Sequence, residues 1–282
     1  MIADFVASWS LFHNAYLVGW LLAVVLATIG VLVVARDQIF IGAAVSQASV
    51  LGIAVVLRAG PTLAGLGLTG ADSEGFQSVM AVVASALAAL TTTRWSEHGR
   101  STHEALTGWV YLLGASAAIL VVAHSPHGLE EVHRVLSSSI IGASASDVWL
   151  FAGLAVLTLG AVTLRARELV LVAIDPAMAA AVGLRVRVWS AAVSVWLGMV
   201  VGLAINLAGV IYAFGCLVLP ALVARNLCRE VRHMFVVAPA VGLLAAVVGF
   251  VLANHWDYPP AQMTVALLCG LLAASALVRP RR

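Results

Sequence analysis

The chain has 282 residues, of which 62% are hydrophobic and only 10% carry a charge. A soluble domain has about 25% charged residues, so this composition excludes a cytosolic enzyme, a nucleic-acid-binding protein and a disordered chain. The apolar stretches are about 18–22 residues long, which predicts an all-α membrane protein that crosses the bilayer several times.

Nine apolar stretches are long enough to cross a bilayer as helices. In chain order they cover residues 15–35, 38–57, 76–93, 104–123, 147–164, 188–205, 208–224, 234–253 and 261–278. The sixth and seventh are the least clearly separated, because only Asn206 and Leu207 lie between them. We expect residues 1–282 to form a single transmembrane domain, with the glycine-rich segment 58–75 as a loop.

The distribution of arginine predicts the orientation of the bundle. All arginines except Arg58 and Arg134 follow spans one, three, five, seven or nine. Cytoplasmic loops carry the excess of cationic residues, so we expect the N-terminus outside and the C-terminus in the cytoplasm.

Almost no ionisable side chain lies deep inside a predicted span. Ion-coupled carriers usually keep such groups in the membrane, and an intramembrane hydrolase needs them for chemistry. The sequence also contains no lysine, which the nucleotide-binding P-loop requires. We therefore expect a protein that is not an enzyme and binds no cofactor, with any transport energy supplied by another subunit.

The predicted cytoplasmic loop 165–187 contains a short helix signal. Asp175 suits the N-cap, Pro176 suits the first helical position and Gly183 suits the residue that ends a helix. A helix of about two turns is marginal alone in water. Such a helix either docks on a partner or packs under the bundle.

Two further patterns suggest contact with a solute. His127, Glu130 and His133 lie in the predicted outer loop, where a helix over 129–142 would bring Glu130 and His133 to one face. Imidazole and carboxylate ligands bind zinc or manganese, although these residues also suit an ordinary polar loop.

Asn206 either lines a pathway or caps a helix end. Gly198 and Gly202, four residues apart, permit close helix packing.

Four stretches, taken in order, resemble the permease subunits of ABC transporters for zinc, manganese and iron. They are Phe40-Ile-Gly42-Ala-Ala44-Val-Ser46-Gln47-Ala48…Gly52, Asp175-Pro176…Ala180…Gly183, Gly209 to Ala221 followed by Ala224-Arg225, and Asp257-Tyr-Pro259-Pro260. The resemblance extends from about residue 15 to residue 279.

The resemblance implies an importer of divalent transition metal ions in the cell (inner or plasma) membrane. The permease would be a dimer with the pathway on its two-fold axis, and the second permease chain would be identical or different. ABC ATPase subunits would bind in the cytoplasm and hydrolyse ATP, and an extracytoplasmic solute-binding protein would deliver the metal. Residues 175–183 would form the coupling helix that seats in the ATPase, through Asp175, Pro176, Ala180 and Gly183.

The chain departs from the family in its second span. The family's motif usually reads Gly-Asp-Ala-Leu-Ser-His-Ala, and its Asp and His face the pathway. Here those positions hold Ala43 and Gln47, and the usual proline before Gly52 is Leu51. Ser46 and Gln47 offer only weak oxygen ligands, and they could equally make ordinary hydrogen bonds between helices.

Several functions stay open at this point. The chain could import a metal with weak ligands, pair with a ligand-bearing permease in a heterodimer, or carry a cargo that is not a bare ion. A stand-alone secondary transporter or channel is the competing class.

Overall fold

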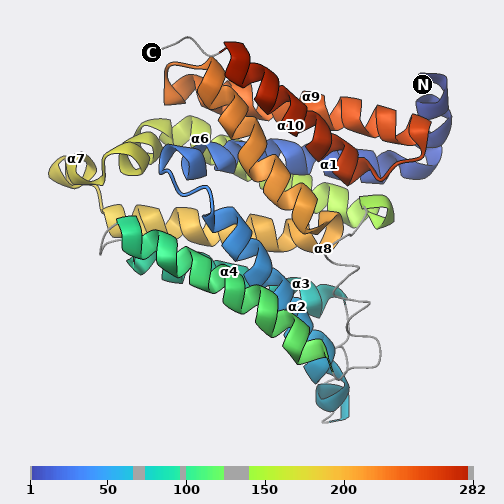
Figure 1. Ribbon diagram of the computed structural model, residues 1–282, viewed down its shortest axis with the longest axis horizontal. Helices are drawn as coiled ribbons and strands as arrows, with labels where there is room; N and C mark the ends of the chain where they lie inside the picture. Colours follow the sequence, from blue (N-terminus) through green and yellow to red (C-terminus); the bar gives the residue numbers. More distant parts are fainter. Residues whose placement is uncertain (1, 66–73, 96–99, 124–139, 279–282) are drawn as a thin grey trace. The chain divides into compact units, whose positions relative to one another are not determined.

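The computed structural model describes residues 2–65, 74–95, 100–123 and 140–278. Throughout these ranges the regular elements are helices, without a strand. Figure 1 shows them in chain order as α1 (Ile2–Ala35), α2 (Ile41–Gly65), α3 (Glu74–Trp95), α4 (Arg100–Val122), η2 (Ile140–Gly142), α6 (Ala145–Ile174), α7 (Pro176–Ala181), α8 (Val186–Leu227), α9 (Val231–Trp256) and α10 (Pro260–Val278). The predicted all-α membrane fold is confirmed.

Within the described ranges, eight helices are long and apolar enough to cross a membrane. One of them, α8, has 42 residues, which at 1.5 Å per residue is about twice the thickness of a hydrocarbon core. Its helical geometry is interrupted at Gly209, where φ is 77° and ψ is 168°. The segments on either side, 186–208 and 210–227, correspond to the sixth and seventh predicted spans. Asn206 and Leu207, expected to connect those spans, are helical instead.

Two predicted loops are partly helical. Helix α2 continues through Pro61 to Gly65, so the expected loop at 58–75 begins later than predicted. Helix α6 passes a kink at Arg165 and continues to Ile174, so much of the expected loop 165–187 is also helix. Leu169, Val172 and Ala173 are buried on this extension. Their spacing of three and four residues is that of one helix face, a pattern that apolar length alone does not reveal.

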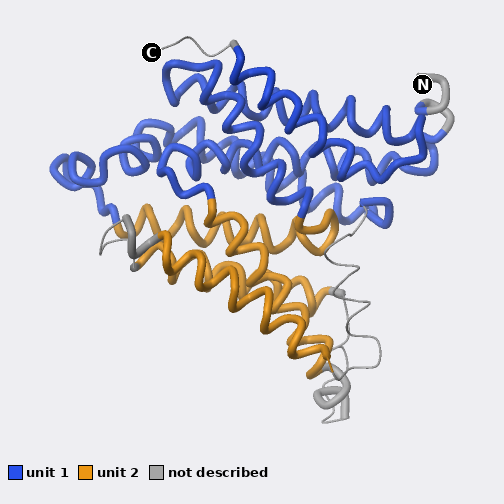
Figure 2. Tube along the Cα trace, in the orientation of Figure 1, with its two compact units in different colours: residues 1–39, 139–186, 211–282 blue, residues 40–138, 187–210 orange. Residues whose placement is uncertain are grey.

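The described chain divides into two compact units (Figure 2). Unit 1 comprises residues 1–39, 139–186 and 211–282, and unit 2 comprises residues 40–138 and 187–210. The break at Gly209 lies next to the point where α8 passes from unit 2 to unit 1.

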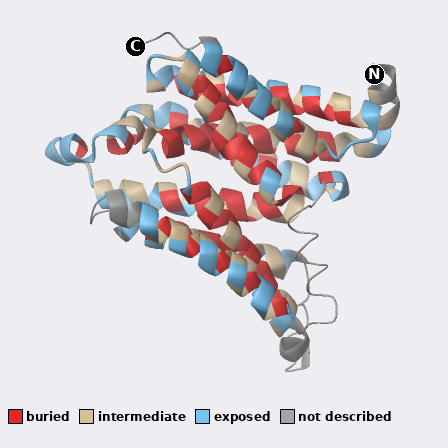
Figure 3. Ribbon diagram, in the orientation of Figure 1, coloured by how far each residue is buried: buried red, intermediate tan, exposed pale blue. Residues whose placement is uncertain are grey.

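In unit 1, α1 packs against α6 and α9, and α9 packs against α10. Helix α1 is apolar on all sides, and most residues from Leu22 to Val34 are buried (Figure 3). Glycine permits its close approach to α8, because a Cβ atom at Gly30 would lie 1.7 Å from the backbone oxygen of Leu217. The Tyr212 hydroxyl of α8 also donates a 2.8 Å hydrogen bond to the Gly19 carbonyl of α1.

In unit 2, α2 packs against α3 and α4. The first segment of α8 lies on α3, where a Cβ atom at Gly198 would come within 2.4 Å of the Ala86 Cα. The Ser85 hydroxyl of α3 donates a 2.6 Å hydrogen bond to the Gly198 carbonyl. The close packing predicted for Gly198 and Gly202 is therefore confirmed.

Candidate functional site

The short helix α7 is held by its own sequence at both ends. The Asp175 carboxylate accepts a 2.9 Å hydrogen bond from the Met178 amide, and Pro176 is the first helical residue. At the other end Gly183 has a φ of +86°, and its amide donates to the Ala180 carbonyl across 3.0 Å. The Leu184 amide donates to the Ala179 carbonyl, also across 3.0 Å, which completes a Schellman cap.

Helix α7 projects from the end of α6 in unit 1 (Figure 1). Ala179 is fully buried, so one side of α7 rests against the protein. The apolar side chains of Ile174, Met178 and Val182 are each more than half exposed. Arg165, Arg167 and Arg185 are exposed on the adjoining segments. An exposed apolar patch flanked by cations suits contact with another protein. The coupling role of Asp175, Pro176, Ala180 and Gly183 stays a prediction.

The predicted pathway residues of α2 lie in different surroundings. Ser46 is fully buried, and its hydroxyl donates a 2.8 Å hydrogen bond to the Gly42 carbonyl one turn earlier. Ala43, Gln47 and Leu51 are only partly buried, and their spacing of four residues puts them on one side of α2. That side is therefore more accessible than the Ser46 side. Whether it lines a pathway stays a prediction.

Asn206 makes a contact between helices. Its Nδ2 donates a 2.5 Å hydrogen bond to the Ser78 hydroxyl of α3, and both residues belong to unit 2. Asn206 lies inside α8, so the alternative of a helix cap does not hold. Its side chain ties α8 to α3 close to the break at Gly209.

The polar side chains buried in the described helices share one chemistry. They are all hydroxyls: Thr28, Ser46, Ser49, Ser85, Thr92, Thr107, Thr158, Ser194, Thr264 and Ser275. The described residues contain no group of three or more His, Cys, Asp and Glu residues that could hold a metal ion. The predicted metal ligands His127, Glu130 and His133 lie outside the described residues.

Sequence reasoning missed a charged cluster at the end of α1. The Arg225 guanidinium lies 3.7 Å from the Asp37 carboxylate, which links the ends of α8 and α1. The neighbouring Arg36 is partly buried, and its buried Nη2 has no hydrogen-bond partner in the described chain. Desolvation by burial lowers the pKa of Arg36 to about 10, so its side chain stays charged at physiological pH. The signal in the sequence was an Arg-Asp pair directly after an apolar span.

Comparison with known proteins identifies the family. The sequence profile of the ABC 3 transport family matches residues 8–279. The chain belongs to this family. It is a multi-pass plasma-membrane permease, the membrane subunit of an ABC transporter, and is not itself an enzyme.

Named relatives match over nearly their whole length. The manganese transport system membrane protein MntC of Halalkalibacterium halodurans is 20% identical over 99% of this chain and 91% of its own length. The manganese import system permease protein ScaB of Streptococcus parasanguinis is 22% identical over 100% of this chain and 96% of its own length. Among solved structures, PsaBC from Streptococcus pneumoniae in complex with Fab matches with a TM-score of 0.80. That match has 20% identity and covers 99% of this chain and 97% of the other, so it shows that the two share a fold.

Proposed function

We propose that this chain is the membrane permease subunit of an ATP-driven importer of divalent transition metal ions, with manganese as the leading cargo. The observation that carries the proposal is the family match over residues 8–279. The manganese relatives add to it, because the chain spans more than nine-tenths of the length of MntC and ScaB.

The accessible side of α2 favours manganese over zinc. Gln47 is partly buried on that side and offers an amide oxygen, whereas the buried Ser46 hydroxyl is bonded to the Gly42 carbonyl. Oxygen ligands suit manganese, whereas zinc is usually bound by imidazole or thiolate. A transported ion must also leave its site quickly, so weak ligands are sufficient. Ala43 and Gln47 are therefore compatible with the transport of manganese.

The assembly follows from the permease role. ABC ATPase subunits bind in the cytoplasm and hydrolyse ATP, and an extracytoplasmic solute-binding protein delivers the metal. A second permease chain completes the pathway, and this chain binds no cofactor of its own. The N-terminus lies outside and the C-terminus in the cytoplasm, as the arginine distribution predicts. Helix α7 then faces the cytoplasm and seats on the ATPase through Asp175, Pro176, Ala180 and Gly183.

One observation favours a second candidate function. Ala43 and Gln47 replace the two residues that the family's motif places in the pathway. A permease without these two residues would fit a heterodimer in which the other chain carries the metal ligands. It would also fit a transporter whose cargo is not a bare metal ion.

Elemental mass spectrometry of a deletion strain tests the proposal. The strain should lack other manganese importers and grow in metal-depleted medium. We expect a selective fall in cell manganese that the wild-type gene restores. A chain with both Asp175 and Pro176 replaced by leucine should be inserted in the membrane but fail to restore the metal. Unchanged manganese, zinc and iron in the deletion strain would refute the proposal.

A further inference from the structure

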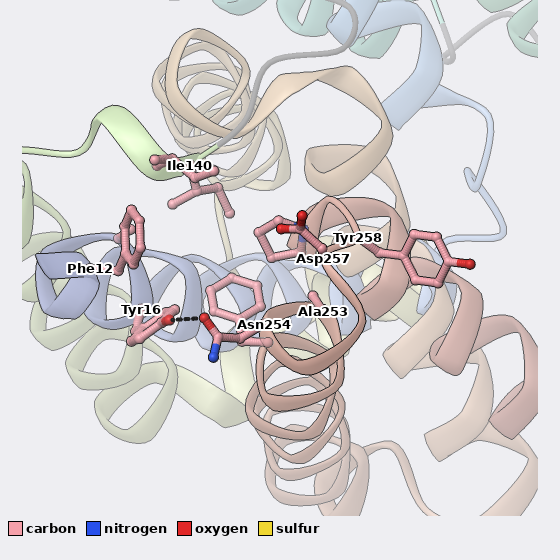
Figure 4. Close-up of a pocket in the computed structure, with 11 residues that line it drawn as sticks. Phe12, Tyr16, Ile140, Ala253, Asn254, Asp257 and Tyr258 are labelled. Carbon is pink, nitrogen blue, oxygen red and sulfur yellow. Dashed lines mark hydrogen bonds between the residues drawn. The ribbon is translucent and has the colours of Figure 1, made fainter. Parts of the chain in front are cut away.

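A pocket of about 120 Å³ lies within unit 1, where α1, η2 and the turn between α9 and α10 meet (Figure 4). The side chains that matter for its chemistry are Phe12, Tyr16, Ile140, Phe250, Asn254 and Asp257. A cavity of about 150 Å³ accepts a molecule of benzene, so this pocket has room for one side chain. The sequence alone does not predict this pocket, because its walls come from segments far apart in the chain.

The pocket combines apolar walls with a carboxylate. Phe12 and Tyr16 of α1 and Ile140 of η2 lie on one side of it, and Asp257 lies across from them (Figure 4). The Tyr16 hydroxyl and Asn254 Oδ1 are joined by a 3.3 Å hydrogen bond, which fixes the polar side chains at the edge. The ring of Tyr258 points away from the others (Figure 4). Aromatic faces beside a carboxylate suit a side chain with an apolar stem and a cationic end.

The charge of the pocket is negative. Helix α9 ends at Trp256 and α10 begins at Pro260, so the negative and positive ends of two helix dipoles meet here and offset each other. The exposed Asp257 carboxylate therefore makes the pocket negatively charged.

The arginines of unit 1 that the structure describes lie at the opposite ends of these helices. Arg36 follows α1, and Arg225 and Arg232 lie where α8 ends and α9 begins. A phospholipid headgroup would bring its phosphate next to the Asp257 carboxylate, without an arginine from this set to neutralise it. The observations therefore favour a cation from a protein partner over a lipid.

We infer that this pocket receives a lysine or arginine side chain of the extracytoplasmic solute-binding protein. The stem of that side chain packs against Phe12 and Phe250, and its charged end pairs with Asp257. The inference rests on the proposed function, which places this end of unit 1 outside the cell and a solute-binding protein above it.

Binding to the reconstituted transporter tests the inference. The permease is placed in nanodiscs with its ATPase, and the probe is the solute-binding protein that stimulates ATP hydrolysis by the wild-type complex. Asp257 has a φ of 58°, and asparagine tolerates this left-handed conformation, so Asp257→Asn removes the charge and preserves the turn. Charge-assisted hydrogen bonds contribute about 1.5–3 kcal/mol, so we expect roughly ten- to hundredfold weaker binding and a smaller salt dependence.

A matched control and a reciprocal change make the test specific. Glu230→Gln removes an exposed carboxylate at the other end of unit 1 and should bind as wild type. Asp257→Arg should abolish binding, and a Lys→Glu or Arg→Glu change at the facing position of the binding protein should restore it.

The outcomes separate this inference from the proposed function. If the wild type imports manganese and Asp257→Asn binds the solute-binding protein normally, the inference is wrong and the proposed function stands. The same holds if native mass spectrometry shows that Asp257→Asn loses a bound phospholipid and not the binding protein. If no solute-binding protein stimulates the wild-type complex and no metal is imported, the inference and the proposed function are both wrong.

Discussion

The Asp175 carboxylate accepts a 2.9 Å hydrogen bond from the amide of Met178, one turn into α7. This contact fixes the first turn of a helix of only six residues, which would otherwise be marginal in water. It also holds Met178 on an exposed part of the helix. A short, exposed helix that is capped at both ends suits the transfer of motion between subunits, which is the role we propose for α7.

Removal of the cap should uncouple ATP hydrolysis from transport. Asp175→Ala loses the side-chain acceptor, and the loss of an N-cap costs about 1 kcal/mol. We expect manganese uptake to fall several-fold in proteoliposomes that contain the ATPase, while hydrolysis continues. Asp175→Asn keeps an equally good cap and should transport nearly as well as the wild type. Equal uptake by Asp175→Ala and Asp175→Asn would show that the cap has no part in coupling.

The break in α8 should depend on glycine. Gly209 has a φ of 77° and a ψ of 168°, a region that residues with a Cβ atom rarely occupy. We expect Gly209→Ala to destabilise the protein by about 1–3 kcal/mol, which thermal unfolding in detergent would detect. Gly160→Ala is the control, because it lies in α6 with nothing within 4 Å of an added Cβ atom. Equal unfolding temperatures of the two variants would show that the break in α8 does not depend on glycine.

The two polar neighbours on α2 should differ in their effect on transport. Ser46 is buried and bonded to Gly42, so Ser46→Ala should leave manganese uptake nearly unchanged. Gln47 lies on the more accessible side, so Gln47→Ala should slow uptake several-fold at low manganese. Reinstating the family's pair with Ala43→Asp and Gln47→His should tighten zinc binding, because imidazole is the ligand zinc prefers. Normal uptake by Gln47→Ala would remove this residue from the pathway.

Cysteine labelling should reveal the orientation. Cys228 directly follows α8 and lies on the predicted cytoplasmic side. Burial raises the pKa of its thiol, which lowers the thiolate fraction and slows the reaction with maleimide, so the reaction is faster at more alkaline pH. In a chain with Cys269→Ala, a membrane-impermeant maleimide should reach Cys228 only after permeabilisation.

An outer position completes that experiment. Gly142 is exposed, with nothing within 4 Å of an added Cβ atom, so Gly142→Cys should be tolerated. When Cys228→Ser is present in the same chain, the thiol introduced by Gly142→Cys should react with the membrane-impermeant maleimide in intact cells. Labelling of Cys228 in intact cells would reverse the predicted topology.

The spans and α7 could be predicted because local sequence determines them. Apolar length alone identifies a membrane-crossing helix, and the signals at Asp175, Pro176 and Gly183 act within a few residues. The continuation of α2 through Pro61 could not be predicted, since proline and glycine usually mark a turn in a soluble chain yet are tolerated in membrane helices. The contact of Tyr212 with Gly19 joins segments far apart in the sequence, as do the walls of the pocket at Asp257.

Metal uptake by defined proteoliposomes tests whether this chain works as a manganese permease driven by ATP. Vesicles containing the permease and its ATPase are loaded with ATP, and radioactive manganese is added outside together with the solute-binding protein. We expect uptake that requires all three proteins and stops when ATP is replaced by a non-hydrolysable analogue. Uptake by the permease alone, driven by a proton or sodium gradient, would refute the proposed function and identify a secondary transporter.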